Sequence, residues 1–377
     1  MDRIYLDHAA TSPIHPDVAK AMFDVLSGTH GNPSSIHSFG RDARRIVDEA
    51  RTMIASTIHA GHNDIIFTGS GTEADNLAIF GTARLKKAGH IITTAIEHHA
   101  VLHACEALEK EGFDMTYLPV DESGVVSVQD VEKALREDTI LVSIMYGNNE
   151  TGAIQPVKEI GELLRDHSAV FHVDAVQAYG VLPINVQELN VDFLAISGHK
   201  INGPKGIGVL YAKAGLPLSP LLYGGEQERK RRAGTENVAS IAGMAAAASI
   251  AIQSMEKRTD QYKELKSIFI ETLEKQDINF SVNSKVEQSL VHVLNLFFPR
   301  VDVEAFLVNL DMEGIAASSG SACTAGSIEP SHVLTAMFGT DSDKLRSSIR
   351  FSFGLNNTKE QIERAAVKTA EIVKRLS

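Results

Sequence analysis

Three short segments place polar groups directly after apolar runs that are typical of buried strands. The first, Phe67–Ala74 (FTGSGTEA), ends in a predicted helix start, and a glycine-rich helix start offers free backbone N–H groups to an anion. The segment is neither a Walker A loop nor a complete GxGxxG fingerprint. Phosphate binding and a plain strand-to-helix turn with Thr72 as its N-cap are therefore both open interpretations.

The other two segments add a carboxylate and an amine. In Phe171–Gln177 (FHVDAVQ), Asp174 follows a buried strand, where it could pair with a buried cation such as a protonated pyridine nitrogen or simply cap the next helix. In Ser197–Gly208 (SGHKINGPKGIG), Lys200 could act as a desolvated Schiff-base amine, and Lys205 is the rival. The order of anion turn, acid and lysine suits pyridoxal phosphate, which needs a phosphate cup, a partner for its ring nitrogen and a lysine.

A fourth candidate is a cysteine in a loop of small polar residues. Cys323 lies in Ala317–Ser327 (ASSGSACTAGS), which predicts an exposed and mobile loop, an unusual environment for a residue that prefers burial. An exposed thiol can react once it is ionised, so chemistry is indicated, and a chance surface cysteine stays open. Cys105, on the apolar side of a predicted helix, fits a buried packing role. With 2 cysteines the chain has no disulfide framework and no CxxC metal cluster, which favours a reduced, cytosolic setting.

Three further groups are weaker candidates. His99 and His103 have helical spacing but lack the HExxH order of a zinc site, and a histidine here could also stack on a cofactor ring. The basic run Arg229–Arg232 is interpreted as a solvated or interface stretch. Arg350 lies on an alternating strand and could bind a substrate carboxylate through two hydrogen bonds, or be an ordinary surface arginine.

These side chains need a scaffold, and the hydrophobic pattern between residues 60 and 215 predicts one. Short apolar runs without strict polar alternation indicate strands covered on both faces, and helical patterns separate most of them. The predicted strands are Ile65–Phe67, Ile91–Ile92, Met115–Leu118, Ile140–Met145, Val170–Val173 and Phe193–Ile196. The predicted helices are Thr72–Lys87, His99–Glu111, Gln129–Arg136 and Val157–Asp166. This alternation predicts an α/β fold with a mostly parallel central sheet and helices on both sides.

The C-terminal third has a different pattern. A long amphipathic stretch leads into a mixture of strands and helices, which predicts a smaller α+β domain. The segments concerned are the amphipathic stretch Asn237–Glu274, strands Leu290–Leu296 and Ile349–Phe353, and helices Val303–Met312 and Thr358–Leu376. We expect a large domain at residues 16–258 and a small domain formed by residues 1–15 and 259–377, with the cysteine loop in the small domain.

Composition narrows the class of protein. The 377 residues carry 36 basic and 48 acidic side chains, and the net charge of −12 argues against a general nucleic-acid binder. A hydrophobic content of 44% with 22% charged residues is ordinary for a soluble globular enzyme. The N-terminus has no signal-peptide core, and Ile241–Ile252, the longest weakly polar run, is shorter than a membrane span. We therefore expect a cytoplasmic protein with no membrane segment and no direct nucleic-acid partner.

Together with further motifs, these residues resemble the NifS/IscS-type cysteine desulfurases, which are pyridoxal-phosphate enzymes of the aspartate aminotransferase fold (fold type I). The resemblance covers nearly the whole chain. Its motifs are Tyr5–Thr11 (YLDHAAT), Gly31–Ser35 (GNPSS), Gly69–Asn76, Glu97–His98, Asn148–Gly152 (NNETG), Asp174–Gln177, Ser197–Lys200 (SGHK), Arg232–Asn237 (RAGTEN), Ser319–Cys323 (SGSAC) and Ile349–Ser352. Such an ordered set is more specific than any single member.

The resemblance implies a role for each matching residue. Lys200 would bind the cofactor covalently, Asp174 would pair with its ring nitrogen, and Gln177 would meet its ring hydroxyl oxygen. His98 would stack on the ring face and take part in catalysis. The phosphate group would be bound by Gly71, Thr72, Ser197, His199 and, from the second subunit of an obligate homodimer, Thr235.

The implied reaction converts L-cysteine to L-alanine. Asn32, Asn149 and Arg350 would hold the L-cysteine substrate, and Asn149 would also contact the cofactor. Cys323 would accept the sulfur as a persulfide and pass it to an acceptor protein, either an iron–sulfur scaffold or a tRNA-thiolating enzyme. The resemblance implies no metal site on this chain beyond a transient iron–sulfur cluster at Cys323. A selenocysteine lyase, another aminotransferase-like pyridoxal-phosphate enzyme and a non-enzymatic sulfur-relay protein are the alternatives.

Overall fold

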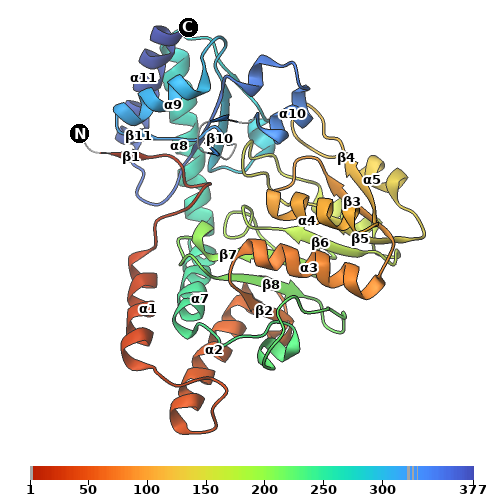
Figure 1. Ribbon diagram of the computed structural model, residues 1–377. Helices are drawn as coiled ribbons and strands as arrows, with labels where there is room; N and C mark the ends of the chain where they lie inside the picture. Colours follow the sequence, from red (N-terminus) through yellow and green to blue (C-terminus); the bar gives the residue numbers. More distant parts are fainter. Residues whose placement is uncertain (1–2, 321–322, 325–326, 329) are drawn as a thin grey trace.

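The computed structural model describes residues 3–320, 323–324, 327–328 and 330–377, and the side chains of residues 321–329 lie outside the described part. Two bodies are visible in Figure 1, one built on a large sheet at the centre and right, the other at the upper left, where both chain ends lie. The first body contains a seven-stranded sheet and the second a three-stranded sheet. The site lies where these two bodies meet, so their construction decides its geometry.

The large sheet has the strand order β2-β8-β7-β6-β5-β3-β4. Its strands are β2 (Ile65–Thr68), β3 (His90–Thr94), β4 (Asp114–Leu118), β5 (Thr139–Ser143), β6 (Val170–Asp174), β7 (Phe193–Ser197) and β8 (Gly208–Ala212). Neighbouring strands are parallel, except that β8 runs antiparallel to both β2 and β7. The prediction of an α/β fold with a mostly parallel central sheet is confirmed.

Helices cover both faces of this sheet. One face packs against α3 (Gly71–Lys86) and α4 (His99–Lys110). The other face packs against α1 (Pro16–Gly28), α2 (Ser38–Thr57), α5 (Val128–Ala134), α6 (Val157–Leu163) and α7 (Val238–Gln253). Because side chains alternate along a strand, Ile66 joins the first core and its neighbours Ile65 and Phe67 join the second. Burial on both faces is the reason why these strands show no polar alternation in sequence.

The small body has a hydrophobic core of its own. Its sheet has the order β14-β10-β9. The elements around this core are β9 (Ser281–Val282), β10 (Val293–Phe297), β14 (Ser348–Ser352), α8 (Met255–Lys275), α9 (Val303–Met312) and α11 (Lys359–Leu376). The N-terminal strand β1 (Ile4–Tyr5) joins this body by pairing in parallel with β11 (Ile315–Ala316). The division of the chain at residues 16–258 against 1–15 and 259–377 stays a prediction.

The structure differs from the sequence prediction in three elements. The stretch Asn237–Glu274 is two helices, α7 and α8, which meet at a 70° bend because α7 is buried in the large body and α8 packs in the small one. The pattern does not predict β8, which follows a glycine-rich segment. Helix α3 begins at Gly71 with Ser70, not Thr72, as its N-cap, since the Ser70 hydroxyl accepts a 3.0 Å hydrogen bond from Glu73 N–H.

No single helix in the described ranges is long and apolar enough to cross a membrane. Only α7 and α8 taken together meet that criterion, by length and composition alone, and they are the two helices joined at the 70° bend.

Candidate active site

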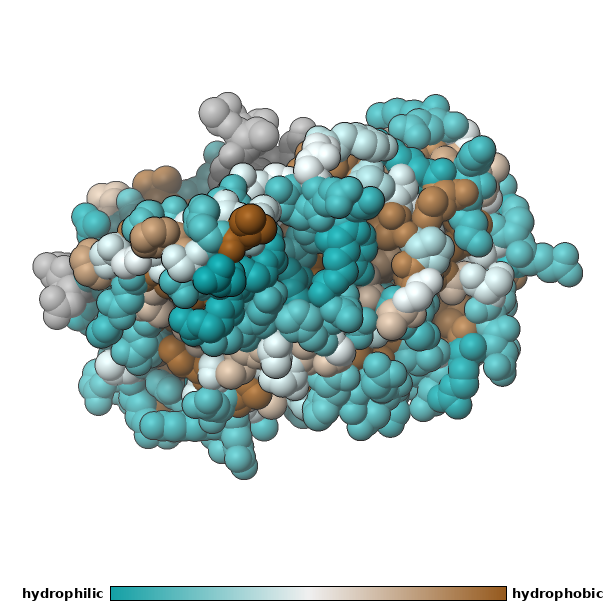
Figure 2. All heavy atoms as spheres, turned by 90° about the horizontal axis from the view of Figure 1, so that it is seen from below, coloured by the Kyte–Doolittle hydropathy of each residue, from teal (hydrophilic) through white to brown (hydrophobic). Residues whose placement is uncertain are grey.

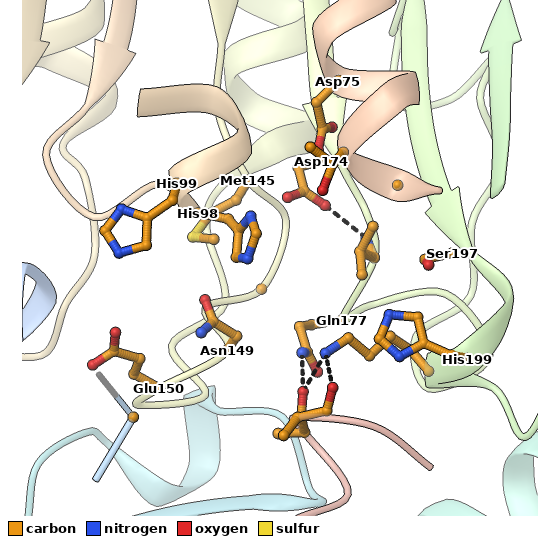
Figure 3. A pocket seen from close by; sticks show the side chains of 18 of the residues that line it. Asp75, His98, His99, Met145, Asn149, Glu150, Asp174, Gln177, Ser197 and His199 are labelled. Carbon is orange, nitrogen blue, oxygen red and sulfur yellow. Dashed lines mark hydrogen bonds between the residues drawn. The ribbon is translucent and has the colours of Figure 1, made fainter. Parts of the chain in front are cut away.

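A cavity of about 490 Å³ opens at the carboxyl ends of the central strands. It gathers nearly all of the predicted cofactor and substrate residues from six separate places in the chain, and Figure 3 shows several of their side chains around one space. The predicted residues that line it are Gly71, Thr72, His98, Asn149, Asp174, Gln177, Ser197, His199, Lys200 and Arg350.

Three predicted residues are not part of this cavity as the described residues define it. Asn32 lies exposed in the loop between α1 and α2, where its Oδ1 accepts a 2.9 Å hydrogen bond from Ser34 N–H, so this chain's own cavity does not contain it. Thr235 is exposed in the segment that leads into α7. The backbone of Cys323 forms β12 (Cys323–Thr324), which pairs with β13 (Ser327–Ile328), but its side chain lies outside the described part.

The start of α3 forms one end of the cavity. Gly71 and Thr72 lie here beside Ser197 and His199 from the end of β7. A Cβ at Gly71 would come within 2.8 Å of Val176 Cγ2, so glycine lets the helix start approach the strand ends. The free N–H groups and positive dipole end of a sixteen-residue helix therefore face the cavity, which suits a phosphate group.

Asp174, at the end of β6, and Gln177, in the segment that follows, line the same cavity, and Figure 3 shows Asp174 beside Asp75 and Gln177 beside His199. In the described part of the chain Asp174 makes one hydrogen bond, accepted by Oδ1 from Val176 N–H at 2.9 Å. Burial raises the pKa of Asp174 to about 6, against the effect of that N–H and of Lys200. Among the described residues Asp174 makes no ion pair, and a protonated ring nitrogen would supply a positively charged partner. Gln177 Nε2 donates to Ala9 O at 2.9 Å.

Lys200 lies in the cavity at the end of a short 3₁₀ turn that follows β7. Its Nζ donates hydrogen bonds to the carbonyl oxygens of Ala9 at 2.5 Å and Ala10 at 2.8 Å. Desolvation, with a smaller effect from Arg350, lowers the pKa of Lys200 to about 8. The rival Lys205 is exposed and does not line the cavity formed by the described residues. Of the two lysines, only Lys200 therefore has the environment of a reactive amine.

Two histidines of the cavity are neutral. His98 is the N-cap of α4, and its Nδ1 accepts a hydrogen bond from Ala100 N–H at 3.1 Å. Desolvation and nearby Lys200 lower the pKa of His98 to about 4, although its ring is open to the cavity. The same two causes lower the pKa of His199 to about 4. His98 therefore carries its proton on Nε2, the nitrogen that is left to act in the cavity.

Arg350 reaches the cavity from β14 of the small body. Its two terminal nitrogens donate to Asn149 O at 2.9 Å and to Asp7 Oδ1 at 2.7 Å. Arg350 is 3% exposed, which excludes the alternative interpretation of an ordinary surface arginine. A substrate carboxylate would have to share or replace the Asp7 contact, which gives Asp7 a role that the sequence did not reveal.

Several residues at the cavity were not found from the sequence. Glu150 is 3% exposed and accepts a 2.5 Å hydrogen bond from Ser331 Oγ, at the N-cap of α10 (His332–Phe338). A Cβ at Gly320 would come within 2.8 Å of the same Glu150 carboxylate. Glu150 thus contacts the chain on both sides of the cysteine loop. The NNETG motif was the available signal, but nothing in it pointed to residues near position 325.

A cluster of histidines lies at the same side of the cavity. The ring centroid of His99 is 4.8 Å from that of His103 and 4.7 Å from that of His332. His332 Nε2 lies 2.9 Å from Glu97 O, so its ring is held by the backbone. No group in the described ranges has the geometry of a metal site. The helical spacing of His99 and His103 is real, and the third histidine comes from the far end of the sequence.

The cavity fits pyridoxal phosphate as judged from its own residues. The cavity is lined by a helix start that a Cβ would block, by an acid that makes no ion pair in the described part of the chain, and by a lysine with a lowered pKa. These are the phosphate site, the ring-nitrogen partner and the amine that the cofactor requires.

Comparison with known proteins identifies the relatives of the chain. The Aminotransferase class-V family model matches residues 4–365. A Bacillus subtilis (strain 168) protein that carries the name IscS 1 is 61% identical over 379 residues, which cover 100% of both chains. The cysteine desulfurase IscS of Dictyoglomus turgidum is 47% identical over 99% of this chain and 95% of its own length. Among solved structures, a NifS-like protein matches with a TM-score of 0.93 at 34% identity and covers 100% of both chains.

Glu97, directly before His98, generates a prediction about pH and stability. Its buried Oε1 accepts hydrogen bonds from Thr94 Oγ1 at 2.6 Å and Met145 N–H at 3.0 Å. Oε2 has no partner in the described ranges, and burial raises the pKa of Glu97 from 4.5 to about 8. Between these two values the folded protein holds a proton that the unfolded chain has lost. The stabilisation is therefore complete below pH 4.5 and is lost as the pH rises through 8.

We expect Glu97→Gln to remove this loss, because the amide keeps both accepted hydrogen bonds and cannot ionise. The difference in free energy of unfolding between variant and wild type should shift in favour of the variant by up to about 1.4 kcal/mol per pH unit between pH 5 and pH 8. Thermal unfolding at several pH values measures it, with Glu106→Gln on the exposed side of α4 as the control. A difference that is constant with pH would contradict the prediction.

Proposed function

The chain belongs to the class-V aminotransferases and, within them, to the NifS/IscS-type cysteine desulfurases with the fold of aspartate aminotransferase, and from this premise we propose how its own residues divide the reaction. The protein is a pyridoxal-phosphate-dependent enzyme that takes sulfur from L-cysteine. The observation that carries the assignment of roles is Lys200, whose amine lies in the cavity with a pKa lowered to about 8.

The residues proposed to hold the cofactor divide into three groups. Gly71, Thr72, Ser197 and His199 would bind its phosphate, Asp174 and Gln177 its ring nitrogen and ring hydroxyl, and His98 and Asn149 its ring. Lys200 would form the covalent link. When bound, pyridoxal phosphate withdraws electrons from the substrate Cα, which acidifies the Cα proton and weakens the carbon–sulfur bond.

Proton movements are proposed to involve Lys200 and His98. Lys200 Nζ, once released, would take the Cα proton of L-cysteine, and its lowered pKa keeps a useful fraction of the amine unprotonated near pH 7. His98, protonated on Nε2, would supply a proton to the carbon that loses sulfur. Arg350 and Asn149 would hold the substrate in place, with the Arg350 side chain shared between substrate and Asp7.

Cys323 is proposed to accept the sulfur. Its thiolate would attack the sulfur of L-cysteine, so that a sulfur–sulfur bond forms as the carbon–sulfur bond breaks. The bonding electron pair would stay with the carbon that loses sulfur, which gains a proton, and Cα would regain its proton from Lys200 before L-alanine leaves. Cys323 is left as a persulfide. The contacts of Gly320 and Ser331 with Glu150 support this role, because they hold both sides of the Cys323 loop at the cavity.

An acceptor protein would then remove the sulfur from Cys323. We propose an iron–sulfur scaffold or a tRNA-thiolating enzyme as that acceptor, and a cytoplasmic location for the exchange. The support is chemical, since the Cys323 thiol must be returned to its reduced state after each turnover. Cys105 is 0% exposed, and burial raises its pKa to about 12, so the sulfur-carrying role does not fall to it.

A homodimer is part of the proposal. Thr235 belongs to the family's phosphate motif yet lies outside this chain's cavity, as a residue that serves a partner would. The chain on both sides of Thr235 is fixed by ion pairs of Arg51 with Glu228 at 2.7 Å before it and of Arg44 with Glu236 at 2.8 Å after it. Apolar side chains also remain exposed near the α1–α2 end, among them Phe23, Leu26 and Ile36 at 67%, 70% and 92%. Figure 2 looks at the molecule from below and shows hydrophobic side chains scattered over a largely hydrophilic face.

The pKa of Lys200 leads to a prediction about cofactor loading. The unprotonated amine reacts with an aldehyde, so the rate at which the apo-protein captures pyridoxal phosphate should rise with a midpoint near pH 8, well below the 10.5 of an ordinary lysine. Visible absorbance in stopped flow measures the rate, and Lys200→Ala should show no such phase. A midpoint at the ordinary lysine value would contradict the proposed environment.

Cys323→Ser should separate sulfur transfer from cofactor chemistry. We expect the variant to bind pyridoxal phosphate with the wild-type spectrum and to lose persulfide formation and sulfur delivery to an acceptor by at least about 100-fold, because the hydroxyl cannot hold the sulfur. Mass spectrometry of the protein and sulfide and alanine release measure the outcome. Cys105→Ser is the matched control and should behave as wild type. Wild-type sulfur delivery by Cys323→Ser would remove Cys323 from the mechanism.

Mixed dimers test the contribution of Thr235 from a partner. Lys200→Ala and Thr235→Val would each inactivate or weaken both sites of their own homodimer. In a mixed dimer, both changes fall in one site and the other site keeps a normal Lys200 and a normal Thr235. We therefore expect mixing and re-association to restore activity, and each mixed dimer should have about half the activity of a wild-type dimer. No recovery in a mixture that exchanges subunits would show that Thr235 acts within its own chain or not at all.

A further inference from the structure

Three buried polar side chains near Asp174 have no part in the proposed catalytic and cofactor-binding roles. Asp75 on α3, His172 on β6 and Ser143 on β5 have exposed fractions of 1%, 0% and 0%. His172 Nδ1 lies 2.8 Å from Ser143 Oγ, and His172 Nε2 lies 3.4 Å from Asp75 Oδ1. Within the described ranges, neither Asp75 Oδ1 nor His172 Nε2 makes a hydrogen bond, and at 3.4 Å each is the polar atom that the other faces. Two buried polar atoms that face only each other need a proton between them.

Asp75 belongs to the wall of the active-site cavity. It lines the cavity together with Asp174, and Figure 3 shows the two carboxyl groups at the same end. The charged groups that act on Asp75 are Asp174 and Glu97, which are both acids. Burial and these two acids raise the pKa of Asp75 well above its ordinary range. Two ionised carboxylates in one buried site repel each other, so ionisation of Asp75 opposes that of Asp174.

His172 cannot neutralise Asp75 as a cation. Burial lowers the pKa of His172 to about 3, so the imidazole is neutral at pH 7. A neutral ring has one N–H and one acceptor nitrogen, and its two neighbours are the Ser143 hydroxyl and the Asp75 carboxyl. If Nδ1 carries the hydrogen, Nε2 can accept a proton from a neutral Asp75.

We propose that Asp75 is a neutral carboxylic acid that donates its proton to His172 Nε2, and that this pair leaves Asp174 as the single ionised carboxylate at that end of the cavity. His172 Nδ1–H then donates to Ser143 Oγ, and the proton stays on Asp75. Asp75 and His172 are therefore positioning residues. The inference rests on the proposed function in one respect, because it assumes that a protonated ring nitrogen faces Asp174.

The pair also connects the proposed phosphate site on α3 with the proposed ring-nitrogen partner on β6. Asp75 lies one helical turn after Gly71, whose N–H end of α3 faces the phosphate site. His172 precedes Asp174 by two residues, so both side chains point to the same face of the sheet. The hydrogen bond between Asp75 and His172 would thus fix the phosphate site on α3 relative to the ring-nitrogen partner on β6.

Three variants test the charge and the hydrogen bond separately. Asp75→Asn keeps a neutral donor to His172, so the affinity of the apo-protein for pyridoxal phosphate should stay within about twofold of wild type. Asp75→Leu removes the donor and should weaken that affinity roughly tenfold. The matched control is Asp174→Asn, the same chemical change at the neighbouring acid. It should weaken the affinity strongly and shift the pH midpoint of the visible absorbance, which Asp75→Asn should leave unchanged.

An infrared measurement on the apo-protein locates the proton without any cofactor. At pH 7 the spectrum of wild type minus Asp75→Asn should contain the band of a protonated carboxyl group, and subtraction of Glu97→Gln separates the band of the other buried acid. A carboxylate band instead would overturn the inference. So would an Asp75→Asn variant that matches Asp174→Asn, or an Asp75→Leu variant that matches wild type. Failure of the wild-type protein to bind pyridoxal phosphate would count against the proposed function, and the infrared result would still decide the state of Asp75.

Discussion

The active site depends on the placement of one amine against two backbone carbonyls. Lys200 comes from the large body, whereas Ala9 and Ala10, which accept its hydrogen bonds, follow a strand that belongs to the small body. The same Ala9 carbonyl accepts from Gln177. A desolvated amine is costly unless its hydrogens are bonded, so the N-terminal segment is required for Lys200 to remain in the cavity. The site therefore exists only where the two bodies are joined by this segment.

Control of charge is the second requirement, and burial supplies most of it. His98 and His199 are neutral because desolvation lowers their pKa values, while the pKa of Glu97 is raised by burial. Lys200 and Asp174 both line the cavity, and their pKa values, about 8 and about 6, lie on either side of neutrality. In the proposed mechanism, Lys200 takes a proton from the substrate and Asp174 pairs with the ring nitrogen of the cofactor. A site in which every titratable group kept its ordinary pKa would carry several competing charges and would bind a phosphate ester less selectively.

The sequence predicted the parts of this site that follow directly from strand ends. Lys200 and Asp174 were identifiable because each comes after a continuous apolar run, and the carboxyl ends of parallel strands meet at one edge. The pairing of Asp75 with His172 and of Glu150 with Ser331 was not predictable, since each joins residues about 100 or more positions apart that no local pattern links. The break between α7 and α8 was missed for a related reason: no glycine or proline marks the chain near Ser254, and the bend arises because the two helices pack in different cores.

The small body completes the site by presenting a strand and a loop to the large one. Arg350 on β14 donates to Asn149 O, and the adjoining Glu150 contacts both Gly320 and Ser331, which lie on the two sides of the cysteine loop. One short stretch of the large body, Asn149–Glu150, is thus in contact with Arg350 and with the residues on both sides of the loop that carries Cys323. Because the two residues are adjacent in the backbone, a shift of one would move the other. In the proposed mechanism, the arginine that would bind the substrate carboxylate and the loop that carries the proposed sulfur acceptor are therefore both in contact with the same two residues.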